Sequence, residues 1–176
     1  MFNKLREGWG KYKLAQKLKH LQMHRAIVGL GQAEYIGILF NVSDLRSEEI
    51  VKRLVKHLVK QNKRVKCLGY VDLKERLNIP MSTLRFDYFT SKELDFGYVP
   101  KSTAADHFME ERFDLLLDLD LENDFPVQCI SQLSQAKCKV GPQFVGQHYD
   151  ISIKLQEQDL TKMVEESLRY LEMIKK

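Results

Sequence analysis

The chain has 176 residues, of which 44% are hydrophobic and 30% charged, and it carries a formal net charge of +4. This length fits one domain of ordinary size with an appended arm, and the apolar content is enough to fill a real core. No window approaches about 18 uninterrupted apolar residues, which excludes a transmembrane helix, and no apolar signal-peptide core follows the basic N-terminus. We therefore expect a cytoplasmic protein, with at most a peripheral position at the inner membrane.

The positive charge is concentrated at the N-terminus. Residues 1–25 contain seven of the 28 basic residues and one of the 24 acidic ones, a net charge of +6; this leaves 21 basic against 23 acidic residues, or −2, for the remainder. Such asymmetry predicts an arm that meets an anionic partner rather than a uniformly basic nucleic-acid-binding domain. The arm covers residues 1–32, and its expected partner-binding residues are Lys4, Arg6, Trp9, Lys11, Lys13, Lys17 and Lys19.

The arm is also amphipathic. On a helix, Phe2, Leu5, Trp9 and Tyr12 would form one stripe, and Leu14, Leu18 and Leu21 a second one roughly opposite. We expect the two glycines that flank the only tryptophan, Gly8 and Gly10, to interrupt this helix, and the VGLGQ segment at residues 28–32 to be a flexible joint. Three partners suit a basic amphipathic arm: an anionic membrane surface, RNA (including the ribosome) or an acidic protein groove. Alternatively, the leucine stripe packs on the protein's own core.

After the arm, the pattern predicts a strand, a helix and a strand. Residues 35–40 are almost continuously apolar, as expected for a strand buried on both faces of a parallel sheet. An amphipathic helix follows, with Ser47 as its expected N-cap, and residues 65–71 form the second strand. This βαβ unit should have a right-handed crossover.

The remaining elements continue the alternation of strands and helices. Residues 149–155 alternate apolar and polar, which predicts a half-exposed strand near a sheet edge. The fold class is therefore α/β: a three-layer, Rossmann-like or flavodoxin-like domain over residues 33–176, with a mostly parallel sheet and helices on both faces. The other expected elements are strands at 85–89, 113–119 and 138–141 and helices at 102–110, about 125–137 and 159–174.

A ligand cleft is expected where the strands end, because open parallel sheets bind ligands beyond the carboxyl ends of their strands. The carboxylates there could hold Mg²⁺, which prefers one or two carboxylates with waters and phosphates. Equally, these acids could solubilise loops or cap the helix that follows. The candidates are Asn41, Asp44, Asp72, Asp118 and Asp120, together with His148 in the GPQFVGQHYD loop.

Other site chemistries find little support. No GxGxxG or P-loop motif follows a strand, no GxSxG elbow is present, and no acid or cysteine completes a metal site with His20 and His24. The three cysteines, Cys67, Cys129 and Cys138, contain no CxxC pair and suit reduced, buried thiols. We therefore predict no catalytic residue, no bound metal and no cofactor.

Two resemblances bear on these expectations. The run from YIGILFNVSD through VKCLGYVD to FDLLLDLDLENDFPVQCISQLSQAKCKVGP resembles an uncharacterised conserved family of Bacteroidetes bacteria, a domain of unknown function, which implies no activity. The last segment is also similar to the N-terminal Rossmann-like half of heptosyltransferase-type (GT-B) glycosyltransferases. That second resemblance implies a fold and no catalytic role, and 176 residues leave no room for the other half of such an enzyme. The matching positions are Phe113, Asp114, Leu117, Asp118, Leu133, Ser134, Ala136, Lys137 and Gly141.

Two functional hypotheses follow. The first is a non-catalytic α/β binding or adaptor protein, which docks through residues 1–25 on a membrane-associated or ribonucleoprotein partner. The second is a small divalent-metal-dependent enzyme that acts on a phosphorylated or glycosyl substrate, with Asp44, Asp72, Asp118 and Asp120 around the ion.

Overall fold

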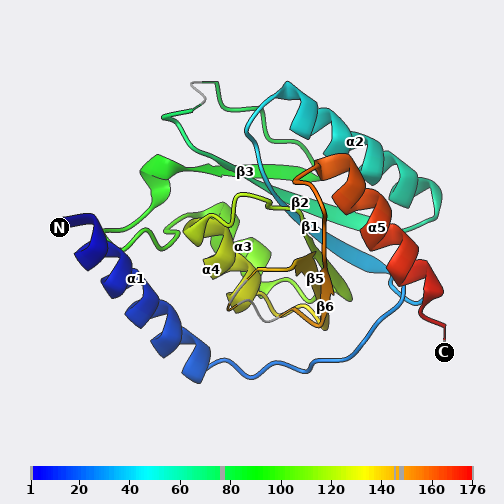
Figure 1. Ribbon diagram of the computed structural model, residues 1–176, viewed down its shortest axis with the longest axis horizontal. Helices are drawn as coiled ribbons and strands as arrows, with labels where there is room; N and C mark the ends of the chain where they lie inside the picture. Colours follow the sequence, from blue (N-terminus) through cyan, green and yellow to red (C-terminus); the bar gives the residue numbers. More distant parts are fainter. Residues whose placement is uncertain (1, 76–77, 145, 147–148, 176) are drawn as a thin grey trace.

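The computed structural model describes residues 2–75, 78–144, 146 and 149–175. At its centre lies a six-stranded sheet in the order β3-β2-β1-β4-β5-β6, in which all neighbouring strands are parallel (Figure 1). The chain enters the sheet in the middle with β1 and adds β2 and then β3 on one side. It then returns to the middle and adds β4, β5 and β6 in turn on the other side of β1. This is the doubly wound order of Rossmann-like folds. The predicted α/β class is confirmed. The sequence allowed a Rossmann-like or a flavodoxin-like strand order, and the structure has the Rossmann-like one.

Every strand and helix expected after residue 33 is present, with ends shifted by a few residues. β6 lies at a sheet edge, as its alternating pattern predicts. Among the described residues, no helix is both long and apolar enough to cross a membrane. The elements are α1 (Phe2–Lys19), β1 (Tyr35–Asn41), α2 (Leu45–Lys60), β2 (Arg64–Val71), β3 (Phe86–Thr90), η1 (Ser91–Glu93), α3 (Thr103–Glu110), β4 (Leu115–Asp118), α4 (Phe125–Leu133), β5 (Cys138–Pro142), β6 (Ile151–Ile153) and α5 (Leu160–Met173).

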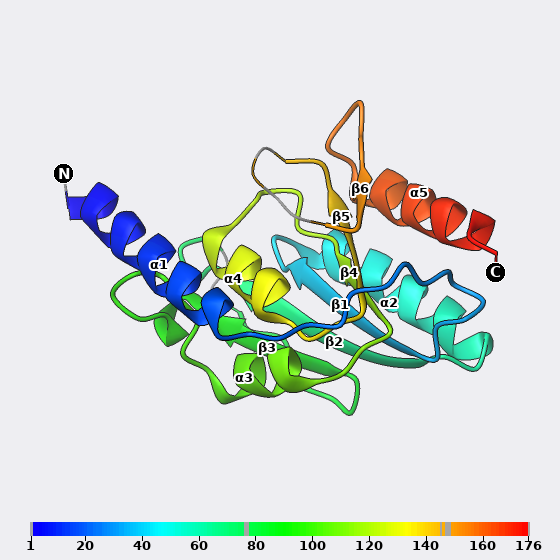
Figure 2. The same cartoon turned by 90° about the horizontal axis from the view of Figure 1, so that it is seen from below.

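The two faces of the sheet carry separate apolar cores. α2 and α5 cover one face, and α3 and α4 cover the other (Figures 1 and 2). Within β1, Ile38 and Phe40 belong to the core under α2 and α5, whereas Leu39 between them belongs to the core under α3 and α4. Successive strand side chains point to opposite faces, so a strand buried on both sides needs apolar residues at every position.

The N-terminus of α2 corrects one prediction. The helix begins at Leu45, with Asp44 and not Ser47 as its N-cap. The Asp44 carboxylate accepts a hydrogen bond from the Ser47 N–H (2.7 Å), and the Ser47 hydroxyl accepts one from the Asp44 N–H (3.3 Å). Aspartate and serine both satisfy free N–H groups at a helix start, and here they do so reciprocally in a capping box.

α1 packs against the rest of the fold as one continuous helix (Figure 2). Its Leu14 is buried in a cluster with Val99, Cys129 and Leu133. A Cβ atom at position 10 would clash with the carbonyl oxygen of Gly97 and approach the Phe125 ring to 2.8 Å. The prediction that the glycines interrupt the helix is therefore wrong: glycine at position 10 permits a close approach between backbones.

The segment between α1 and β1 is held along its length. The Ala26 N–H donates to the carbonyl of Lys137, and the Leu30 N–H donates to the carbonyl of Leu171 in α5, both at 2.9 Å. Leu30 is buried in the core under α2 and α5. The segment at 28–32, predicted to be a flexible joint, is thus anchored to α5.

Candidate functional site

The direction of the strand order reverses between β1 and β4, which end at Asn41 and Asp118. This is the place where doubly wound sheets bind ligands. A cavity of about 230 Å³ lies there, which is below the roughly 300–1,000 Å³ typical of small-molecule sites. Its lining includes Asn41, Ser43, Asp44, Arg46, Glu122 and Gln158.

The first turn after β1 differs from a phosphate cradle in its chemistry. It reads NVSD over residues 41–44, without glycine. In dinucleotide-binding folds, the ligand's phosphate sits at the N-terminus of the helix that follows this turn. Here the carboxylate of Asp44 already accepts the hydrogen bond from Ser47 at that helix start. An internal anion therefore occupies the position that a phosphate would need.

Asp118 is buried at the end of β4, with 1% of its surface exposed. One carboxylate oxygen accepts a hydrogen bond from the Tyr149 hydroxyl (2.7 Å), and the other accepts one from the Asp120 N–H (3.1 Å). Burial raises the Asp118 pKa to about 6, against the lowering effect of these hydrogen bonds and of Ser131. Its two oxygens thus bind the chain's own donors.

Asp120 performs a similar role in the loop after β4. Its two oxygens accept hydrogen bonds from the N–H groups of Glu122 (3.0 Å) and Asp124 (2.7 Å). Burial raises its pKa to about 8, and the neighbouring charges of Asp118 and Asp124 add to the rise. The Asn41 side-chain amide donates in turn to Asp124. The carboxylates that the sequence placed at this edge therefore brace the loop and the start of α4.

Asp72 directly follows the end of β2. It borders a second cavity, of about 550 Å³, which also contacts Glu7 and Lys11 of α1. Its carboxylate accepts a hydrogen bond from the Lys74 N–H (3.0 Å). Burial and the charges of Asp72 and Asp124 raise the pKa of Tyr70 on the same cavity.

The predicted cleft residues are therefore divided between two cavities and a buried loop. Across the described ranges, no three His, Cys, Asp or Glu residues gather in a way that could hold a metal ion. His148 lies outside the residues that the structure describes.

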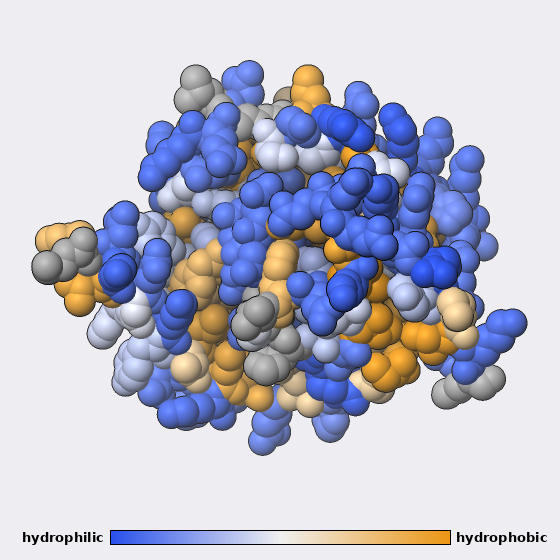
Figure 3. Space-filling model, in the orientation of Figure 1, coloured by the Kyte–Doolittle hydropathy of each residue, from blue (hydrophilic) through white to orange (hydrophobic). Residues whose placement is uncertain are grey.

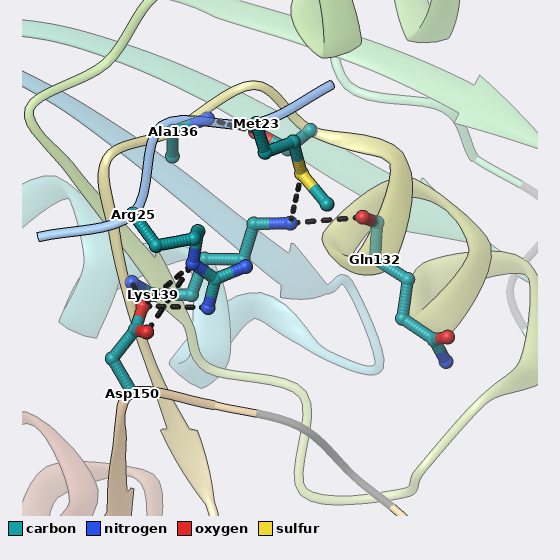
Figure 4. Close-up of polar contacts among 7 residues, drawn as sticks. Met23, Arg25, Gln132, Ala136, Lys139 and Asp150 are labelled. Atoms are coloured by element: carbon teal, nitrogen blue, oxygen red, sulfur yellow. Dashed lines mark hydrogen bonds and ion pairs between the residues drawn. The ribbon is translucent and has the colours of Figure 1, made fainter. Parts of the chain in front are cut away.

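Lys139 on β5 was not predicted as a functional residue. Its position inside the short apolar CKVG strand was the pattern that could have indicated a buried lysine. Its buried ammonium donates to the carbonyl of Gln132 (2.8 Å) and to the sulfur of Met23 (3.5 Å; Figure 4). Beside it, Arg25 forms an ion pair with Asp150 (2.6 Å). Burial and the Arg25 charge lower the Lys139 pKa to about 7, although Asp150 opposes them. These contacts hold the segment that follows α1 against β5.

The basic residues of α1 divide into two groups. Lys13 pairs with Asp95 (2.5 Å), and Arg6 donates to the carbonyl of Phe96 (2.8 Å) and lies over the Tyr98 ring. Both side chains thus fasten α1 to the loop before α3. The others are exposed, although Lys11 also borders the cavity beside Asp72. The N-terminal end, at the left of Figure 3, presents apolar and hydrophilic residues side by side. Exposed basic residues of α1 are Lys4, Lys11, Lys17 and Lys19.

The strand order, the two helical layers and the glycine-free first turn define a doubly wound α/β protein whose phosphate position is taken by its own aspartate. Within this class, the chain belongs to DUF6913, a family of unknown function whose model matches residues 6–174. The match includes most of α1. No curated protein and no solved structure matches the chain. The expected membership of an uncharacterised family is thus confirmed, while its Bacteroidetes origin and the local glycosyltransferase similarity stay predictions.

Proposed function

We propose that this protein is a non-catalytic binding protein that docks on an anionic partner through the outward side of α1. We call this surface the docking face. Its apolar part consists of Phe2, Leu5, Trp9 and Tyr12, and its exposed flanking cations are Lys4 and Lys19.

The observation that carries the proposal is the exposure of the four apolar side chains. Phe2, Leu5, Trp9 and Tyr12 are 74%, 65%, 49% and 57% exposed, although the same helix buries Leu14 on its other side. Contiguous exposed apolar residues with a polar rim mark interaction sites, because their transfer from water is favourable. Among the described residues, no carboxylate forms an ion pair with Lys4 or Lys19, which leaves these charges for an anionic partner.

A cytoplasmic location is part of this proposal. The three cysteines are buried and unpaired, which suits a reducing compartment.

The test replaces apolar residues of the docking face in the full chain and follows complex formation in cells. Leu5→Ser/Tyr12→Ser should leave folding intact, because both side chains are exposed, but should abolish association with the native partner. Met81→Ser/Leu84→Ser is the matched control, since both residues are 87% exposed and lie away from α1, in the loop before β3. Wild type and control should enter the same complex on native gels. Retention of that complex by the α1 variant, or no complex with wild type, would overturn the proposal.

A further inference from the structure

The docking face has the layout of a helix that lies in the plane of a membrane interface. At about 100° per residue, its four apolar side chains occupy one continuous arc. Basic residues flank this arc on both sides: Arg6, Lys13 and Lys17 lie along one margin, and Lys19 and, further round, Lys4 lie along the other. The one acid of α1, Glu7, falls outside the arc, on the same side of the helix as buried Leu14.

The second margin remains basic although two of its members contact the domain. Asp95 neutralises Lys13, but Arg6 contacts only a backbone carbonyl and the rings of Phe96 and Tyr98. Phe96 is itself 56% exposed, so it extends the apolar surface beside Arg6. Lys17 is exposed and adds a further charge to this margin.

The shape of this surface favours a flat partner. Gly10 and Leu14 fasten the opposite side of α1 to Gly97 and the α4 cluster, so only the outward half of the helix can be reached. A membrane surface needs only this outward half, because an interfacial helix buries one apolar face at the headgroup level and keeps its other side out of the bilayer. Phosphate contacts also call for cations at the centre of the surface, whereas here the centre is apolar and the cations lie at its margins.

We infer that the partner is an anionic phospholipid surface, on which α1 lies parallel to the membrane plane. This inference rests on the proposed function, because it names the partner of the same docking face. Trp9 and Tyr12 pack against each other with ring centroids 6.0 Å apart, and such aromatic residues with polar tips prefer the headgroup level. The flanking lysines extend their amines toward the anionic headgroups. Binding is reversible, because a single amphipathic helix with a few charges gives moderate affinity.

Trp9 provides a direct readout, because it is the only tryptophan in the chain. The full-length protein is titrated with vesicles of phosphatidylcholine alone and of phosphatidylcholine mixed with phosphatidylserine. We expect a blue shift of the Trp9 emission and co-sedimentation with the mixed vesicles only, both reversed by high salt.

Charge variants then test the role of the lysine margin. Lys4→Gln/Lys19→Gln should weaken partitioning by at least about tenfold, since each lysine near an anionic surface contributes about fivefold. Lys56→Gln/Lys60→Gln on the exposed side of α2 removes the same charge and should bind like wild type. Equal weakening of both variants would overturn the inference, because binding would then depend on net charge alone.

The outcomes separate this inference from the proposed function. If no vesicle shifts the Trp9 emission while Leu5→Ser/Tyr12→Ser still loses its partner in cells, the lipid inference fails and the proposed function stands. Saturable binding of single-stranded RNA without vesicle binding would likewise assign the docking face to a nucleic acid. If neither vesicle binding nor a cellular partner is found, both proposals fail.

Discussion

The carboxylates at the ends of the strands and the docking face of α1 differ in how their polar and apolar groups are satisfied. At the strand ends, Asp118 and Asp120 accept hydrogen bonds from Tyr149 and from local backbone N–H groups. On α1, large apolar side chains and exposed lysines face water. Topology indicates where a cleft can form, but only groups that the fold leaves unsatisfied can stabilise a complex with a partner. Among the described residues at the strand ends, the buried Asn41 side-chain oxygen is without a hydrogen-bond partner, whereas α1 exposes four large apolar side chains. The comparison therefore points to α1.

The largest expected effect concerns the packing of α1. Gly10→Ala should lower the free energy of unfolding by about 2–3 kcal/mol, because its Cβ would overlap the Gly97 carbonyl. Gly8→Ala is the matched control: nothing lies within 4 Å of its Cβ, so the better helix propensity of alanine should raise stability by up to about 1 kcal/mol. Urea unfolding measures both. Equal effects would mean that α1 does not pack closely on the loop at Gly97.

A smaller effect is expected at the strand ends, as a function of pH. The folded-state pKa of Asp120 is raised from 3.8 to about 8, so this group favours folding fully below 3.8 and loses that contribution as pH rises toward about 8. Asp120→Asn cannot ionise, and one of its two accepted hydrogen bonds is lost at every pH, at a cost of about 1 kcal/mol.

Relative to wild type, Asp120→Asn should therefore gain stability as the pH rises across this window, because only the wild type loses the contribution of a protonated Asp120. The free energy of unfolding, measured by urea titration at several pH values, gives the difference directly. A constant difference between the two proteins would contradict a buried carboxylate at this position.

The smallest expected effect is that of magnesium. A bound ion at 100-fold over its Kd would stabilise the fold by about 2.7 kcal/mol. We expect no change in melting temperature at millimolar Mg²⁺, because the oxygens of Asp118 and Asp120 already accept hydrogen bonds within the chain. A rise in melting temperature that Asp118→Asn abolishes would instead support the metal-dependent enzyme. The functional site would then lie at the strand ends and not on α1.

Patterns local in sequence predicted the architecture well. Apolar runs such as residues 35–40 identified the buried parallel strands, and the alternation near residue 151 placed the edge strand β6. The N-cap of α2 was misplaced at Ser47, because aspartate and serine three residues apart both satisfy the rules for a helix start.

Contacts between distant segments could not be predicted in the same way. Gly10 was interpreted as a helix breaker, since nothing in its neighbourhood reveals that Gly97 lies against it. The acids after β4 were correctly expected at the strand ends, but the Tyr149 hydroxyl that donates to Asp118 lies 31 residues further along the chain. Lys139 went unnoticed because its partners, Met23 and Gln132, are brought together only by the fold.

The most direct test of the central claim uses the same photocrosslinking reaction in living cells at α1 and at the strand ends. A photoreactive benzophenone residue replaces either Gly8, which has open space on the outward side of α1, or Ser43, which lines the cavity at the switch point. After irradiation, mass spectrometry identifies what is attached to the full-length protein. We predict adducts at position 8 and none at position 43. Adducts at position 43 without any at position 8 would contradict the account and place the function at the strand ends.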